Sequence, residues 1–264
     1  MPYWGDPDFS KELEGIDKIW RYINFEKYVD LLERKRQYFV SGSKLQEIDP
    51  YEGHFEKLNF LYPERVDEFD KQFLEQKDRR ERYEDPKSVF INCWHINEDE
   101  SMAMWKLYAG IDNGIAIQTT LEKLKKSFHE HIQRVDIRKV QYINYKKQNI
   151  SVSWIPWRFS KKGKSFSHEN ELRVIIEGTE YRVRAVTSDD GRWLGSDVIP
   201  QGQQIPIERN ENGIWANVDL NYFIEKIFVS PLSQDWFLDL VKSITKRYGL
   251  DPNIVEKSPL YSKP

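Results

Sequence analysis

A short segment near the middle of the chain places acidic and basic side chains at the start of an apolar run. Glu169, Glu171 and Arg173 occupy alternate positions, and three β-branched residues follow at 174–176, which predicts a buried strand from residue 169 onward. Because successive strand side chains point to opposite faces, we expect both carboxylates and the guanidinium on one face. Burying such charges is costly unless they are paired or bind a ligand. Two interpretations therefore stay open, a neutralised Glu–Arg network and a polar binding site.

The residues that lead into this segment are basic. Gly163 lies between lysines, which predicts a loop before the strand. Residues 158–164 form a local basic patch, in which Lys164 is a candidate substrate-binding residue together with His168, which follows the patch. These side chains suit a phosphate-bearing ligand.

Aromatic residues accompany two further candidate sites. Arg21 either packs its stem against Trp20 and Tyr22 or grips a phosphate in a bidentate manner. Trp105 and Tyr108 lie three positions apart in a predicted helical segment, so they either belong to the core or form a wall on which a flat ring stacks. Both places are candidates for nucleotide binding.

The composition is typical of a globular protein with a charged surface. Among 264 residues, 39% are hydrophobic, 14% aromatic and 31% charged, with a net charge of −3, which argues against disorder and against a global basic field for nucleic acid. Cys93 is the only cysteine, and Cys93 and His95 lack a second pair at zinc-like spacing, so we expect a reducing compartment and no metal. No apolar run approaches about 18 residues, and residues 1–20 lack a signal core, so we expect a cytoplasmic protein without a membrane partner.

Strands and helices are predicted to mix without a regular βαβ repeat. Strands are expected at 19–23, 37–40, 88–95, 115–118, 140–145, 150–154, 169–177, 213–218 and 226–229. Helices are expected after Asn24, from Pro63, at 101–108, after a capping box of Thr119 and Glu122, and after Ser233, with a polar loop between residues 41 and 54.

This order predicts an α+β fold with a mixed, largely antiparallel β-sheet, of which a split sheet is one form, flanked by helices. We expect a single domain over 1–264, with a loose lead-in at 1–15 and a polar insertion or hairpin at 179–212. The chain contains no Gly-rich nucleotide fingerprint and no nucleophile elbow.

Several segments taken together resemble a bacterial family, domain of unknown function 2971. The resemblance spans nearly the whole chain and implies one domain-sized unit without an established activity. The segments are Trp20-Arg21-Tyr22, Asp49-Pro50-Tyr51-Glu52-Gly53, Cys93-Trp94-His95, 98–108, Gly114-Ile115-Ala116-Ile117, 164–173 and Val229-Ser230-Pro231 with the last helix.

The chain is more distantly similar to ADP-ribosyltransferases, whose NAD site lies in a split β-sheet. Those enzymes use an early-strand Arg or His and a late-strand Glu, in some members within a Glu-x-Glu motif. Arg21 matches the early position and Glu169-Asn170-Glu171 matches the late one. The middle element of those enzymes has no clean counterpart here.

This resemblance implies NAD as a substrate and a role for each candidate residue. Glu171 would stabilise an oxocarbenium-like transition state, and Glu169 would orient or deprotonate the nucleophile. Arg21 and Lys164 would hold the pyrophosphate, and Trp105 or Tyr108 would stack on the nicotinamide. Arg173 would pair with one glutamate and keep it ionised. Tyr22 and His168 are further candidates for substrate binding.

Three function classes stay open, in this order. The first is an NAD-using or nucleotide-modifying enzyme that serves phage defence or toxicity, for which a protein or nucleic-acid acceptor is one option. The second is a non-catalytic module that binds a nucleotide or a nucleic-acid end through aromatic residues and the patch at 158–164. The third is a metal-dependent nuclease using Asp49, Glu169 and Glu171, although an Asp…Glu-x-Lys pattern is lacking.

The enzyme hypothesis makes one structural prediction. Arg21 and Glu171 should face a single cleft, about 10 Å or less apart, as in a pocket of the usual size. If the two residues lie on opposite faces of the sheet, the enzyme hypothesis built on Arg21 and Glu171 fails.

Overall fold

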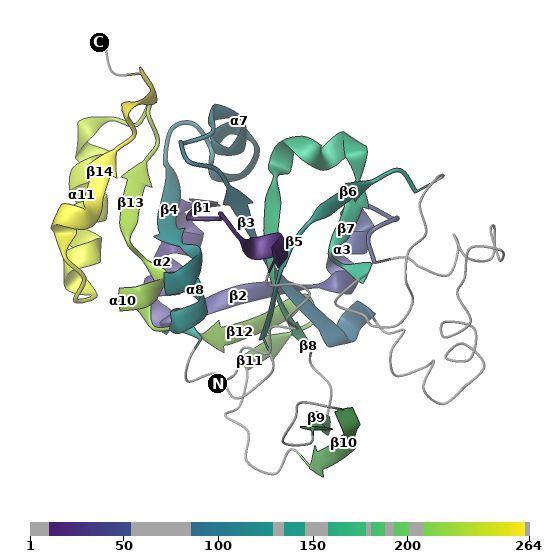
Figure 1. The fold of residues 1–264 in the computed structure, drawn as a ribbon. Coiled ribbons are helices and arrows are strands. Elements are labelled where there is room, and N and C mark those ends of the chain that lie inside the picture. The colour runs from purple at the N-terminus through teal and green to yellow at the C-terminus, as the bar shows by residue number, and fades with distance from the viewer. Residues whose placement is uncertain are drawn as a thin grey trace.

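The computed structural model describes residues 11–53, 86–128, 135–145, 158–177, 181–187, 193–200 and 208–261. These residues form the predicted α+β fold, with helices packed around a mixed, largely antiparallel sheet (Figure 1). That the chain forms one domain stays a prediction.

The main sheet has the strand order β11-β12-β2-β3-β1-β4-β13-β14, and β8 and β5 continue it from β3. Every pair in this sheet is antiparallel except β13 with β14. Its strands are β1 (Lys18–Asn24), β2 (Arg36–Ser41), β3 (Val89–Ile96), β4 (Gly114–Thr120), β5 (Val135–Lys139), β8 (Glu171–Glu177), β11 (Glu208–Asn210), β12 (Gly213–Asn217), β13 (Lys226–Val229) and β14 (Val255–Lys257).

The sheet forks at β3. One edge of β3 pairs with β8 from Val89 to His95. The opposite edge pairs with β2 near its start, at Ile91, and with β1 near its end, at His95. The strands β1 and β2 therefore share one edge of β3 and separate between these two contacts.

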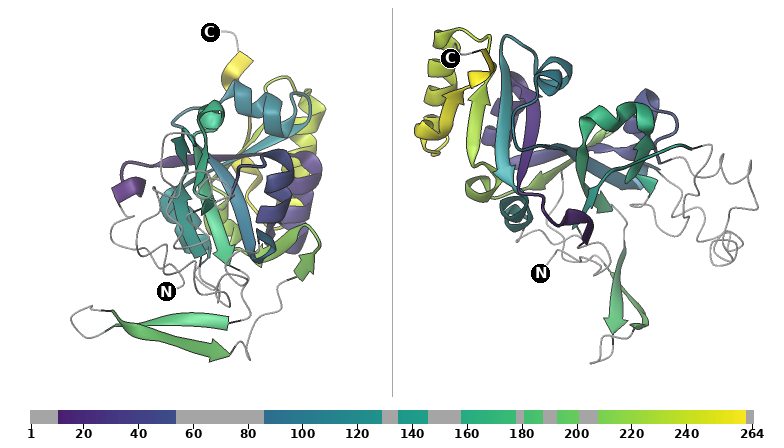
Figure 2. Two further views of the ribbon diagram at one scale, coloured as in Figure 1. Left: turned by 90° about the vertical axis from the view of Figure 1, so that its right-hand side faces the viewer. Right: turned by 45° about the horizontal axis from the view of Figure 1, so that its top comes forward.

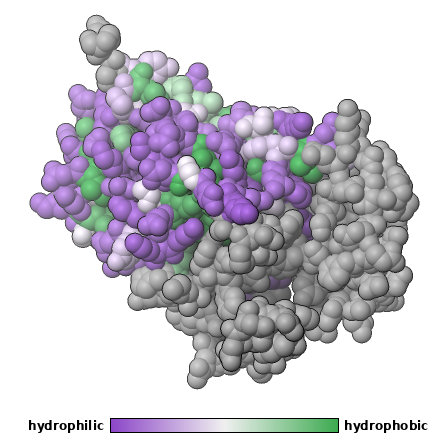
Figure 3. Space-filling model, viewed as in Figure 1, coloured by the Kyte–Doolittle hydropathy of each residue, from purple (hydrophilic) through white to green (hydrophobic). Residues whose placement is uncertain are grey.

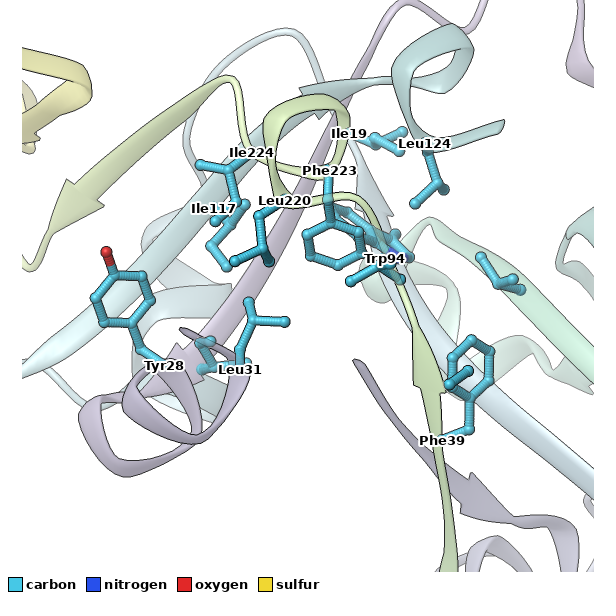
Figure 4. Packing of buried hydrophobic residues seen from close by; sticks show 14 of the residues in the cluster. Ile19, Tyr28, Leu31, Phe39, Trp94, Ile117, Leu124, Leu220, Phe223 and Ile224 are labelled. Carbon is cyan, nitrogen blue, oxygen red and sulfur yellow. The ribbon is translucent and has the colours of Figure 1, made fainter. Parts of the chain in front are cut away.

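Helices cover one face of the sheet. Buried side chains from α2 (Phe25–Arg34), α8 (Leu121–Ser127), α10 (Leu220–Phe223) and α11 (Asp235–Arg247) join alternate residues of the strands in the largest apolar cluster. Figure 4 shows Trp94 of β3 meeting Phe223 of α10 in this cluster, with Tyr28 and Leu31 of α2 nearby. We call this side of the sheet the helix face.

The other face carries two smaller apolar clusters. One consists of Trp20, Tyr22, Ala116 and Phe228 under a short helical segment, α7 (Met102–Met104) with η4 (Trp105–Ala109). The second consists of Val89, Ile91, Phe159 and Ile175. We call this side the second face, and the polar residues between its two clusters form the candidate site.

Several local predictions are confirmed. The amide of Asn24 caps α2 by accepting a hydrogen bond from the Lys27 N–H. The strands expected at 19–23, 37–40, 88–95, 115–118, 213–218 and 226–229 are present as β1, β2, β3, β4, β12 and β13. Residues 181–187 and 193–200 pair as the antiparallel hairpin of β9 (Tyr181–Thr187) and β10 (Trp193–Pro200).

Other local predictions are wrong. The expected loop after residue 41 contains α3 (Gly42–Ile48), because the Ser41 hydroxyl caps it by accepting from Lys44 N. Likewise, the expected loop before Glu169 contains β7 (Lys161–Gly163), paired with β6 (Gln141–Ile143), and the 3₁₀ helix η5 (Lys164–Glu169). The N-caps of α8 and α11 are Thr120 and Gln234, each one residue later than expected.

The helix expected from Pro63, the strand at 150–154 and most of the lead-in lie outside the described residues. In the described part of the chain, no helix combines the length and apolar character needed to span a membrane. Hydrophilic residues dominate the coloured surface in Figure 3, with small apolar patches between them. Two further views in Figure 2 show α11 packed along β13 and β14.

Candidate functional site

Five buried charged side chains of alternating sign form a continuous network on the second face. The guanidinium of Arg173 pairs with Glu52 and, at 2.9 Å from Nη2 to Oε2, with Glu171. The Nζ of Lys162 lies 3.6 Å from Glu171 Oε2 and 2.5 Å from Glu169 Oε2. We call these residues the charge network. Three carboxylates and two cations give it a formal net charge of −1.

Each member of the network is held by a different part of the fold. Glu171 and Arg173 lie two apart on β8, so strand alternation puts them on one face. Lys162 comes from β7, and Glu169 is the last residue of η5. The prediction that the strand includes Glu169 is therefore wrong, although the Glu169 carboxylate still reaches the network.

The turn that supplies Glu52 depends on a glycine. Gly53 has a φ of +65°, and a Cβ there would lie 2.4 Å from the ring of Phe159. This close approach brings Glu52 and the Phe159 carbonyl to the same guanidinium, and that carbonyl accepts a hydrogen bond of 2.6 Å from Arg173 Nη1. Only glycine satisfies both the left-handed backbone and the contact.

Glu171 and Arg173 are ionised despite their burial. Burial would raise the pKa of Glu171, but Arg173 and Lys162 outweigh it, so the pKa lies below its ordinary value. Burial would lower the pKa of Arg173, and the negative charges of Glu171 and Glu52 raise it instead. Burial raises the pKa of the Cys93 thiol, which stays protonated and hydrogen-bonds Glu171.

Two neutral groups connect the network to its surroundings. The hydroxyl of Tyr108, in η4, donates to Glu169 Oε1 at 2.6 Å, while the residue as a whole is 49% exposed. The ring of His95 lies 2.6 Å from the Glu169 carbonyl through Nδ1, which must carry the proton because a carbonyl only accepts. Its Nε2 is buried without a hydrogen-bond partner. His95 thus offers an unused acceptor beside the network.

Arg21 is not part of this site. Trp20 pairs with His95, which pairs with Glu171, so these three share the second face. Arg21, the next residue, points to the helix face and donates from Nη1 to the Cys93 carbonyl at 2.5 Å, in the fork where β1 has left β3. The prediction that Arg21 and Glu171 face one cleft is therefore wrong, and the NAD site built on Arg21 fails with it.

Burial in the fork lowers the pKa of Arg21 to about 10. Its position explains why an arginine occurs on this strand, because the fork leaves a carbonyl of β3 without a strand partner at that point. The hydrogen bond from Arg21 to that carbonyl is a structural role that accounts for the arginine without a ligand.

The other predicted substrate-binding residues are divided between core and surface. Tyr22 and Trp105 are buried in edge-to-face contact at 5.3 Å, the Tyr22 hydroxyl accepting from Ser101 N and the Trp105 indole donating to Glu100. They do not form an open stacking wall. Lys164 and His168 are exposed on η5. Of the basic patch, Arg158 and Lys162 are buried.

Sequence reasoning missed three residues of the site. Glu52 was part of a recognised motif, but nothing local indicates that it meets residue 173. Lys162 lies among several lysines, and the pairing of β7 with β6 that positions it is not visible as a local pattern. His95 was considered only as a metal ligand, and its pairing with Glu171 depends on the β3–β8 register.

The described residues contain no group of three His, Cys, Asp or Glu side chains placed to hold a metal ion. Asp49, Glu169 and Glu171, the acids of the nuclease alternative, do not form such a group. The geometry therefore gives that alternative no support.

Comparison with known proteins supports the family resemblance over part of the chain. A family described as protein of unknown function (DUF2971) matches residues 104–174, which extend from the end of α7 through Lys162, Glu169 and Glu171 to the middle of β8. No curated protein and no solved structure matches the chain.

The network predicts a large cost for removing its central cation. Replacing Arg173 by methionine leaves Glu52 and Glu171 buried without a guanidinium, so the free energy of unfolding should fall by about 3–5 kcal/mol in chemical denaturation. The matched change Arg36→Met removes an exposed pair with Glu208 and should cost at most about 1 kcal/mol. Equal effects of both substitutions would contradict a network that depends on Arg173.

The state of His95 predicts a pH dependence of stability. Burial lowers the pKa of His95 from its ordinary value of 6.5, so the unfolded chain binds this proton more readily than the folded protein. The free energy of unfolding should therefore fall as the pH drops below 6.5, until the folded pKa is passed. The difference between the parent protein and His95→Gln, measured from pH 7.5 to 5, should shrink on acidification. His168→Gln controls for loss of an exposed imidazole, and a constant difference for His95→Gln would contradict the assignment.

Proposed function

We propose that this chain is a nucleotide-modifying enzyme with NAD as its candidate substrate, and that the reaction takes place at the edge of the charge network beside Tyr108 and His95. One observation carries the proposal. The ionised carboxylate of Glu171, within a buried network of negative formal charge, adjoins the neutral imidazole of His95 with its unused acceptor. Perturbed and unsatisfied groups of this kind gather at functional sites.

The charge of the network favours a substrate that becomes positive during reaction. In cleavage of NAD, the bond between the nicotinamide nitrogen and the ribose breaks, and its electron pair leaves with the nicotinamide. Positive charge then develops on the ribose, as in glycoside cleavage. Glu171, kept ionised by Arg173 and Lys162, supplies the opposite charge within the apolar surroundings of the second face.

The second requirement is a base for the attacking hydroxyl. The Nε2 of His95 is unprotonated because Nδ1 carries the proton toward the Glu169 carbonyl. It can therefore take the proton of the nucleophile. With water as the nucleophile the product is ADP-ribose, and with a protein or nucleic-acid hydroxyl the product is an ADP-ribosylated acceptor.

The aromatic and basic residues keep narrower roles in this proposal. Tyr108 is the half-exposed ring next to Glu169 and is the candidate for stacking the nicotinamide. Lys164, exposed on η5, is the candidate phosphate contact, whereas Arg21 has no role in the proposed reaction. We place the enzyme in the cytoplasm, where the thiol of Cys93 stays reduced, and retain a defence role as part of the proposal.

Nicotinamide release from NAD by the purified chain tests the proposal. Glu171→Gln and His95→Gln should each lower the rate by at least about 100-fold, the usual contribution of such groups. Glu122→Gln, the same change on the exposed surface of α8, should leave the rate unchanged. Thermal unfolding of each variant identifies any loss that comes from misfolding. No release by the parent protein, or equal release by all folded variants, would overturn the proposal.

One observation favours a second candidate function, nucleotide binding without turnover. Each carboxylate of the network already has a cationic partner, so the network is stable without a reaction to perform. In that case NAD or a related nucleotide should raise the unfolding temperature while no nicotinamide is released.

A further inference from the structure

The turn that supplies Glu52 also holds a second unsatisfied group. Asp49 follows α3 and is only 7% exposed. Its Oδ1 accepts a hydrogen bond of 3.0 Å from Tyr51 N, and Glu52 N donates to the Asp49 carbonyl at 2.9 Å. The second carboxylate oxygen, Oδ2, is buried and has no hydrogen-bond partner. Leaving a carboxylate oxygen in this state is costly, and a ligand that donates a hydrogen bond would remove the cost.

A pair of stacked tyrosines adjoins this carboxylate. The rings of Tyr51 and Tyr145 lie 5.6 Å apart with an interplanar angle of 25°. Tyr51 is 55% exposed, so solvent reaches part of its ring even though Tyr145 stacks on it. Burial raises the pKa of the Tyr145 hydroxyl, and the negative charges of Asp49 and then Glu52 raise it further, which shows that both carboxylates lie close to the pair. Figure 1 shows α3, which precedes Asp49, beside β7.

We propose that Asp49 Oδ2 and the open ring of Tyr51 form a subsite for a nucleobase that carries an exocyclic amino group. A planar ring would stack on Tyr51, as bases do on exposed aromatic side chains. Its amino group would donate to Oδ2, since a carboxylate only accepts.

The hydrogen bonds already made at Asp49 narrow the choice of base. Guanine recognition by a carboxylate uses two oxygens for two neighbouring donors, and here Oδ1 is occupied by Tyr51 N. One free oxygen matches a single amino group, as in adenine. The subsite rests on the proposed function, because NAD carries an adenine, and the contacts from Glu52 through Arg173 to Glu171 join this turn to the charge network.

Calorimetric titration of the full chain with adenosine and with inosine tests the subsite. Inosine has the same ribose but a carbonyl in place of the amino group. Adenosine should bind about 10-fold or more tightly, the effect of about one hydrogen bond to a charged group. Asp49→Asn keeps an oxygen for Tyr51 N and presents an amide donor instead, so it should reverse the preference.

Two further variants test the stacking surface. Tyr51→Ala should weaken both nucleosides about 10-fold or more, while Tyr51→Phe should bind like the parent protein. Tyr261→Ala, the same change at another exposed tyrosine, should have no effect. Absence of binding by the folded parent protein, or equal affinities that Asp49→Asn leaves unchanged, would overturn the subsite. Equal affinities combined with weak binding of 2′-deoxyadenosine would also overturn it and would assign Asp49 to the ribose.

The subsite and the proposed reaction can fail independently. Turnover of NAD without discrimination between adenosine and inosine would contradict the subsite and leave the enzyme proposal standing. Selective adenosine binding that depends on Asp49, without release of nicotinamide, would do the reverse.

Discussion

The structure around the candidate site depends on the buried guanidinium of Arg173. Removing this cation from water is costly, and only fixed partners of opposite charge make up the cost. Glu52, Glu171 and the Phe159 carbonyl are such partners, and they come from a turn, a strand and a segment before β7. A single guanidinium therefore connects three separate parts of the chain. Lys162 then continues the alternation of charge from Glu171 to Glu169, so Glu169 and the buried guanidinium belong to one network.

The fork of the sheet divides the molecule into a structural and a polar face. On the helix face, large apolar side chains from four helices fill the space beside the strands, and Arg21 satisfies a carbonyl that the fork leaves open. On the second face, two small apolar clusters flank the charge network and lower the dielectric constant around it. The unsatisfied acceptors of His95 and Asp49 adjoin the charge network. The proposed reaction thus lies on one side of β3 and β8, the second face.

Local patterns in the sequence predicted much of the fold and a part of the site. Strand positions and the cap of α2 depend on neighbouring residues, and so does the shared face of Glu171 and Arg173, so these were predicted correctly. The places of Glu52 and Lys162 depend on a turn and a strand pairing that join distant segments, which no local pattern reports. Arg21 was assigned to the wrong face for the same reason, because the register of β1 on β3 decides its orientation.

The central claim is that the unused acceptor of His95 is a point of ligand contact. Nitrogen NMR of the imidazole side chains, with His95→Gln to assign the signal, measures this directly. At pH 7 the signal of Nε2 should be that of an unprotonated nitrogen, with the proton on Nδ1, and addition of NAD or its product ADP-ribose should shift it. An Nε2 that carries the proton, or one whose signal is unchanged at saturating nucleotide, would contradict the account.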